Sequence, residues 1–110
     1  MKRLQPRKNE RVSHLRDVTC RVPASGRVLR GNTIDLSVDG AKLFTLLALR
    51  TGDRVELVWE GTQPPVTVGG HVVHVQVNEE GAWAGVDFFQ PMEPAVYDRL
   101  RGKRGRERLA

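Results

Sequence analysis

The 110-residue chain has few cysteines, few aromatic side chains and no long apolar run. A single cysteine, Cys20, excludes a disulfide within the chain and fits a reducing compartment. The longest apolar stretch, residues 43–49, is too short to cross a bilayer, and residues 1–6 lack the apolar segment of a secretory leader. We therefore expect a cytoplasmic protein that does not insert into a membrane.

Sequence signals of catalysis and of metal binding are also missing. The chain has neither a glycine-rich Walker loop nor a Gly-x-Ser-x-Gly elbow around Ser37, so no hydrolase chemistry is indicated. His71 and His74 are three residues apart in a β-rich segment, and an odd separation sends two side chains to opposite faces of a strand. A lone thiol adds no support for zinc. We expect a protein that is not an enzyme and that uses no metal and no cofactor.

The formal net charge of +5 is unevenly distributed along the chain. Residues 1–16 hold six Lys or Arg against one Glu, residues 99–110 hold the same, and the section between them carries five excess negative charges. A basic segment at each end of an acidic body indicates an anionic ligand or partner that the two ends contact.

The apolar pattern is that of short strands separated by turn residues, in a chain long enough for one domain with a single core. Gly69 and Gly70 indicate a corner or a bulge within the fifth strand. Pro94 marks the start of a short helix that carries apolar side chains toward the sheet. The strands are expected at residues 12–22, 28–37, 41–44, 54–60, 66–77 and 82–89.

Three details refine this prediction. Leu15 breaks the alternation of the first strand, which indicates an irregular start. Gly31 and Asn32 mark a bulge or kink in the second strand. Trp59 and Trp83 each fall in a predicted strand, and with only six aromatic residues in the chain we expect both to fill the core.

The hexapeptide Asp-Leu-Ser-Val-Asp-Gly at residues 35–40 places polar groups at a strand end. Asp35 and Ser37 are two apart, so on an extended strand they project from the same face. Their carboxylate and hydroxyl can hold two adjacent N–H donors, such as those on the N1 and N2 edge of guanine. Gly40 permits a positive φ or a close approach to the backbone. The hexapeptide also imitates a calcium loop, but Leu46 occupies the position of the required glutamate.

Arg7 and Arg11 lie upstream of this hexapeptide, and the planar fork of an arginine fits phosphate oxygens or the O6 and N7 edge of guanine. The two motifs together resemble the PilZ domain, whose hallmark is Arg-x-x-x-Arg followed by Asp/Asn-x-Ser-x-x-Gly. Arg3 and Arg7 have the same spacing, but the strand that the family pattern expects follows Arg11 directly.

The resemblance implies a six-stranded antiparallel barrel that binds cyclic di-GMP. On that basis Arg7 and Arg11 clasp the phosphates and a guanine edge, Asp35 and Ser37 hold the base, and Gly40 shapes the turn. The implied organisation is a flexible basic arm at residues 1–11, a barrel with a short C-terminal helix at 12–101, and a flexible basic tail at 102–110.

The expected function is that of a cyclic di-GMP receptor or adaptor whose surface changes on binding and signals to an unidentified downstream protein. One alternative is a small basic barrel that binds RNA or DNA through its ends, in agreement with a pI of about 10.1. The predicted strands carry few basic residues, which disfavours this alternative. Another is a PilZ-like adaptor that binds a protein without nucleotide, although such proteins usually lack the signature residues present here.

Overall fold

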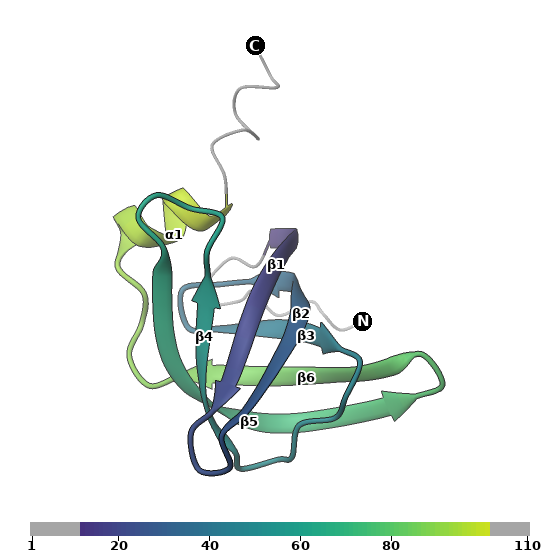
Figure 1. The fold of residues 1–110 in the computed structure, drawn as a ribbon. Helices are drawn as coiled ribbons and strands as arrows, with labels where there is room; N and C mark the ends of the chain where they lie inside the picture. Colours follow the sequence, from purple (N-terminus) through teal and green to yellow (C-terminus); the bar gives the residue numbers. More distant parts are fainter. Residues whose placement is uncertain (1–11, 102–110) are drawn as a thin grey trace, which may run out of the picture.

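The computed structural model describes residues 12–101, which form a closed antiparallel barrel and a short helix (Figure 1). The elements in chain order are β1 (Val12–Val22), β2 (Arg27–Leu36), β3 (Gly40–Thr45), β4 (Arg54–Trp59), β5 (Val66–Asn78), β6 (Gly81–Phe88) and α1 (Pro94–Arg101). The strand order around the barrel is β1-β2-β3-β6-β5-β4, and β1 closes it by pairing with β4. The predicted all-β barrel of six strands with a C-terminal helix is confirmed.

Each predicted strand boundary lies within one residue of the observed one, because turn residues separate the apolar runs. The expected basic arm at 1–11 and basic tail at 102–110 lie outside the described residues. No helix in the described part of the chain is long and apolar enough to span a membrane.

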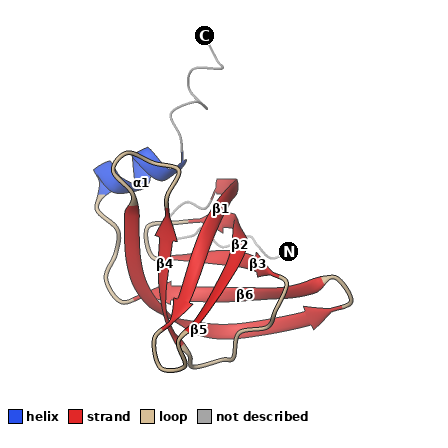
Figure 2. Ribbon diagram, in the orientation of Figure 1, coloured by secondary structure: helices blue, strands red, loops and turns tan. Residues whose placement is uncertain are grey.

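The helix α1 covers one end of the barrel, beside the loop between β4 and β5, whereas the β5–β6 hairpin extends away on the other side (Figure 2). Proline suits the first helical position because its missing N–H has no partner there. Tyr97 and Leu100 are buried in the same apolar cluster as the barrel interior, and Val96 packs against that cluster. The helix thus closes the core as the sequence predicted.

The two tryptophans occupy different environments. Trp59 is fully buried, and its Nε1 donates a hydrogen bond to Thr33 Oγ1 at 2.8 Å inside the barrel. Trp83 is half-buried on the outer face, with its ring edge-on to Phe44 at a centroid distance of 5.2 Å. The prediction of a core position is confirmed for Trp59 and wrong for Trp83, because the alternation of β6 points its two flanking alanines inward instead.

Bulges reset the alternation of side chains in two of the strands that carry the predicted site. In β1 the register with β2 shifts between Ser13 and Arg16, as the irregular start predicted. In β2 the register with β3 shifts between Thr33 and Asp35, so Ile34 is the extra residue. The bulge lies just beyond the position expected at Gly31 and Asn32. It buries both Thr33 and Leu36, three apart, and leaves Asp35 on the outer face.

The long strand β5 pairs with β4 along its first half and with β6 along its second half. Gly70 lies at the transition, opposite Val55 and Phe88, and a Cβ there would meet the carbonyl oxygen of Asp87. This confirms the predicted corner at the glycine pair.

A bulge follows three residues later in β5, where the register with β6 shifts between Val72 and His74. One extra residue converts an odd separation into a same-face arrangement, so His71 and His74 are both exposed on the outer surface. The prediction that they point to opposite faces is therefore wrong. No group of three metal-ligating side chains occurs within residues 12–101.

Candidate functional site

The turn after β2 contains the second half of the hexapeptide and is tightly hydrogen-bonded. Ser37 N donates a hydrogen bond to Gly40 O at 2.9 Å. The Ser37 hydroxyl accepts a hydrogen bond from Asp39 N at 3.3 Å and donates one to Gly40 O at 3.4 Å. Asp39 O accepts a hydrogen bond from Phe88 N at the end of β6, and Val38 O accepts one from Met92 N, which follows β6. The turn is therefore anchored to the barrel by backbone bonds on both sides.

Ser37 lies in this turn and not on the strand, because β2 ends one residue earlier. Its side chain is 3% exposed and its hydroxyl bonds within the turn, whereas Asp35 remains half-exposed on the outer face. The structure therefore separates the two groups that the strand alternation would have placed together. Direct contact of Ser37 with a ligand stays a prediction.

The sequence left two possible reasons for a glycine at position 40, a positive φ or a close approach to the backbone. The structure shows the close approach, and φ of Gly40 is not positive. A Cβ at this position would lie 2.5 Å from the carbonyl oxygen of Val86 on β6. Glycine is required there because β3 and β6 approach each other closely. In the structure Gly40 thus shapes the turn by allowing this approach.

A row of four residues runs across the outer face from the end of β2. Asp35 lies opposite Lys42 on β3, Lys42 lies opposite Gly85 on β6, and Gly85 lies opposite His74 on β5. Neighbouring strands are about 4.8 Å apart, so the row spans roughly 14 Å. The row brings a carboxylate, an ammonium group and an imidazole to one face of the barrel.

A cavity of about 270 Å³ follows this row, and it is lined by Asp35, Lys42, His74 and Gly85 with Asp87 at its side. The imidazole of His74 lies over Gly85, since a Cβ on this glycine would be 2.5 Å from the ring. The absence of a side chain at Gly85 therefore lets the imidazole lie close to β6. The cavity offers acceptors at one end, a cation in the middle and a ring at the other end.

Trp83 extends the same face along β6. Lys42 Nζ lies 5.8 Å from the centre of its indole ring, within the range of a cation–π contact. Lys42 and His74 were not singled out as site residues from the sequence, because their proximity to Asp35 depends on strand register and on the bulge in β5. No local spacing signals such a row.

Arg7 and Arg11 lie outside the described residues, so their contribution stays a prediction. The start of β1 is nevertheless located, since the Cα of Ser13 pairs with that of Asp35. The described part of β1 therefore begins beside the row.

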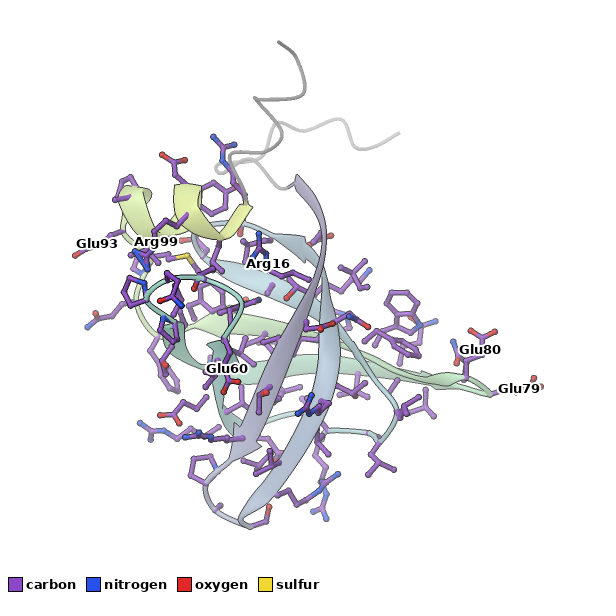
Figure 3. All side chains as sticks on the ribbon, turned by 45° about the horizontal axis from the view of Figure 1, so that its top comes forward. Arg16, Glu60, Glu79, Glu80, Glu93 and Arg99 are labelled. Atoms are coloured by element: carbon purple, nitrogen blue, oxygen red, sulfur yellow. The ribbon has the colours of Figure 1, made fainter. Side chains whose placement is uncertain are left out.

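A second cavity, of about 660 Å³, lies across β1, β2 and the end of β4. Arg16 and Arg30 contribute positive charge to its lining, and Asp17 and Glu60 contribute negative charge; Figure 3 labels Arg16 and Glu60. Asp17 Oδ1 also accepts a 3.0 Å hydrogen bond from Asn32. The two signs balance, so this cavity does not form a positive track for a nucleic-acid backbone.

The fold is a closed six-stranded antiparallel β-barrel with a short C-terminal helix. A family model for the PilZ domain matches residues 5–102, and the chain belongs to this family. No curated protein matches the chain by sequence.

Solved structures with a similar fold include the following three. The PilZ domain of YcgR from Escherichia coli with c-di-GMP matches with a TM-score of 0.70 and 17% identity over 96% of this chain and 98% of that one. YcgR from the same organism in complex with c-di-GMP has a TM-score of 0.63 and 21% identity over 96% and 46%. The inhibitor of motility MotI/DgrA from Bacillus subtilis has a TM-score of 0.70 and 17% identity over 99% and 54%. The chain thus spans about half the length of two of these proteins.

Proposed function

We propose that this chain is a receptor or adaptor for cyclic di-GMP that signals to a partner protein and is not an enzyme. Family membership and the presence of c-di-GMP in the YcgR structures support this ligand. The observation that carries the proposal is the outward position of Asp35, which lines one cavity with Lys42 and His74. Asp35 is also paired with the start of β1, the strand that follows the arginine motif in the sequence. We place the protein in the cytoplasm, in agreement with its lone buried thiol.

The cavity supplies groups that match a guanylate. The Asp35 carboxylate accepts from N1 and N2 of guanine, and the Lys42 ammonium attracts a phosphate. The exposed imidazole of His74 offers a stacking surface for a base or ribose. Each charge-assisted hydrogen bond contributes roughly 1.5–3 kcal/mol to binding.

The arginine motif complements this cavity. Arg11 is two positions before Ser13 in the chain, so their Cα atoms are at most ~7 Å apart. Because Ser13 is paired with Asp35, Arg11 is connected to the row over a short distance. Arg7 and Arg11 then clasp the phosphates and the O6 and N7 edge of the guanine. Ser37 and Gly40 support the site through the turn.

Titration calorimetry with cyclic di-GMP tests the arginine assignment through two matched variants. Arg11→Ala should weaken binding at least tenfold, whereas Arg3→Ala, which removes the same charge from the same segment, should change it less than threefold. Thermal melts of both variants should agree with that of the unmodified chain. Unaltered affinity of the Arg11→Ala protein would refute the arginine role, and equal losses would reduce it to nonspecific charge.

Asp35 is tested in the same way. Asp35→Ala should lower the affinity at least tenfold because the guanine donors lose their acceptor. Glu79→Ala removes a carboxylate at the tip of the β5–β6 hairpin, far from the cavity, and should leave the affinity unchanged (Figure 3). If both variants bind equally well, the cavity beside Asp35 is not the binding site.

Salt and competitor titrations separate the proposal from its alternatives. Binding of a random oligonucleotide by basic chain ends should fall steeply with salt and should not depend on the cyclic dinucleotide. Binding of cyclic di-GMP should resist moderate salt and should not be matched by linear GMP. A chain that binds no cyclic di-GMP at millimolar concentration would instead be an adaptor that acts without nucleotide.

A further inference from the structure

Within residues 12–101, the first part of β5 pairs with a neighbouring strand on one side only. Residues 66–69 pair with β4, from Trp59 opposite Val66 to Glu56 opposite Gly69. Pairing of β5 with β6 begins only at Gly70. In the part of the chain that the structure describes, the other edge of residues 66–68 therefore faces away from β4 without a neighbouring strand.

The direction of the backbone groups along this edge follows from bonds on either side of it. Val72 bonds through both N and O to the Gly52–Asp53 segment, which precedes β4. Gly69 O accepts from Phe89 N at 3.0 Å, on the opposite side of the strand. Because backbone groups of successive residues in a strand point to alternate sides, Thr67 directs its N–H and C=O to the side without a strand.

A groove of about 480 Å³ runs along this edge, between β5 and the segment that leads into α1. Its walls are mainly apolar and include Val68, Met92 and Val96. Phe89 borders it and is 49% exposed, although an aromatic ring of this size is usually buried. The groove thus combines an open backbone edge with apolar side-chain pockets.

Phe89 is held in place from its outer side. The Arg54 guanidinium lies 4.9 Å from the centre of its ring, and the His71 ring stacks on it at 5.8 Å with an interplanar angle of 17°. Beneath it, Gly69 leaves room, since a Cβ there would be 3.3 Å from the ring. These contacts hold a large apolar surface at the mouth of the groove.

Arg99 of α1 brings an unsatisfied donor to the groove. Its Nη2 donates to Pro64 O at 3.2 Å, but its Nε is buried and has no hydrogen-bond partner among residues 12–101. Figure 3 shows Arg99 on the side of α1 that faces the loop before β5. The accessible part of the Arg99 guanidinium supplies positive charge, so a carboxylate or carbonyl oxygen entering the groove would be stabilised beside it, whereas Glu93 supplies a negative charge to the same lining.

We propose that this groove binds an extended segment of a partner protein, which adds to the open edge of β5 as a strand. The segment alternates apolar side chains, which enter the groove, with polar ones, and it carries an acidic residue for Arg99. Backbone bonds to Thr67 provide the pairing, and the apolar pockets provide selectivity. The site lies on the α1 side of the barrel, and its occupation does not depend on nucleotide binding.

The premise can be tested on the chain alone by amide hydrogen exchange. The Thr67 amide should exchange at least tenfold faster than those of Val66 and Val68, whose backbone groups face β4. Equal protection of all three amides would overturn the proposal, because it would show that the edge is already paired.

The probe for binding is a panel of fluorescent heptapeptides that alternate valine or leucine with glutamate. The matched controls carry glutamine in place of glutamate or N-methyl groups on alternate amides, which remove strand pairing and keep the side chains. At least one glutamate peptide should bind and shift the Thr67 and Gly69 amide resonances, and its N-methylated form should bind at least tenfold more weakly. Failure of every glutamate peptide to bind overturns the proposal.

Variants of the groove make the test specific. Thr67→Pro removes the edge N–H at a position where proline is tolerated, and it should weaken peptide binding at least tenfold. Thr67→Val keeps the N–H and should bind as the unmodified chain does. Arg99→Met should weaken the glutamate peptide about fivefold and leave the glutamine peptide unchanged. If the Thr67→Pro and Thr67→Val proteins bind the peptide equally well, the strand-addition model is wrong.

Two further measurements identify the occupant of the groove and separate the groove from the nucleotide site. If sedimentation shows a dimer that Thr67→Pro abolishes, the occupant is a second copy of the chain and the proposed partner segment is wrong. All three variants should retain the affinity for cyclic di-GMP of the unmodified chain. A failure of the groove and a failure of the nucleotide site are therefore distinguishable.

Discussion

Trp59 Nε1 donates a 2.8 Å hydrogen bond to Thr33 Oγ1, and both side chains are fully buried. Thr33 is the last inward residue of β2 before the bulge at Ile34. The bond therefore connects the barrel core to the bulge in β2, after which the alternation of side chains is shifted by one residue and Asp35 points outward. A polar pair in the interior thus helps to set the geometry of the surface site.

Loss of this bond should be costly. Thr33→Val keeps the shape of the side chain and removes the acceptor, so the indole N–H is left buried and unpaired, at a cost of about 1–3 kcal/mol. Urea unfolding should show this loss of stability with an unchanged m-value. The control is Thr67→Val, an exposed position, which should change stability by less than ~0.5 kcal/mol. Equal effects of the two substitutions would contradict the assigned role of Thr33.

Gly40 should be needed for the fold itself. Gly40→Ala brings a Cβ to 2.5 Å from Val86 O, and a backbone oxygen in the adjacent strand cannot rotate away. We expect a destabilisation of roughly 1–3 kcal/mol, typical of overpacking. Gly61→Ala is the control, since its Cβ would meet only the Arg16 guanidinium at 3.8 Å. A melting temperature of Gly40→Ala equal to that of the control would show that β3 and β6 are not in close contact there.

Cys20 should make stability depend on pH in the alkaline range. Burial, with a smaller contribution from Asp53 and an opposing one from Arg27, raises the pKa of its thiol from 9.0 to about 11. The unfolded chain therefore loses this proton first, and the stabilisation, complete below pH 9.0, is lost as the pH rises to about 11.

The measurement is the unfolding free energy of the unmodified chain and of Cys20→Ala across this range under reducing conditions. Between pH 9.0 and 11 the unmodified chain should lose roughly 2–3 kcal/mol more than the variant. Other titrating groups are common to both proteins and cancel in the difference. Parallel pH profiles would show that the thiol ionises equally in the folded and unfolded states.

Lys42 should contribute to nucleotide affinity by charge. Lys42→Met keeps the aliphatic chain and should weaken cyclic di-GMP binding about fivefold at low salt, with a smaller difference at high salt because ions screen the attraction. Arg50→Met removes an exposed charge from the loop between β3 and β4, outside the cavity, and should have no effect. A salt-independent loss at Lys42 would indicate a packing effect and would exclude the electrostatic role.

The turn residues and apolar runs alone predicted the strand boundaries, because glycine, proline and asparagine end strands for local reasons. The face of the strand to which each side chain points was less predictable. Period-two alternation placed His71 and His74 on opposite faces, and the bulge in β5 reversed that result. Bulges arise from the curvature of a closed barrel, and single-residue insertions of this kind leave little local signature.

The sequence by itself determined the family and the positions of the strands along the chain, because these depend on local conformational preferences and on residue types at fixed spacing. Tertiary structure alone decided which side chains meet Asp35. Lys42, Gly85 and His74 come from three strands, and only inter-strand register aligns them in one row. Ser37 likewise moved from the face of a strand into a buried turn because the backbone bonds at the end of β2 outweigh simple alternation.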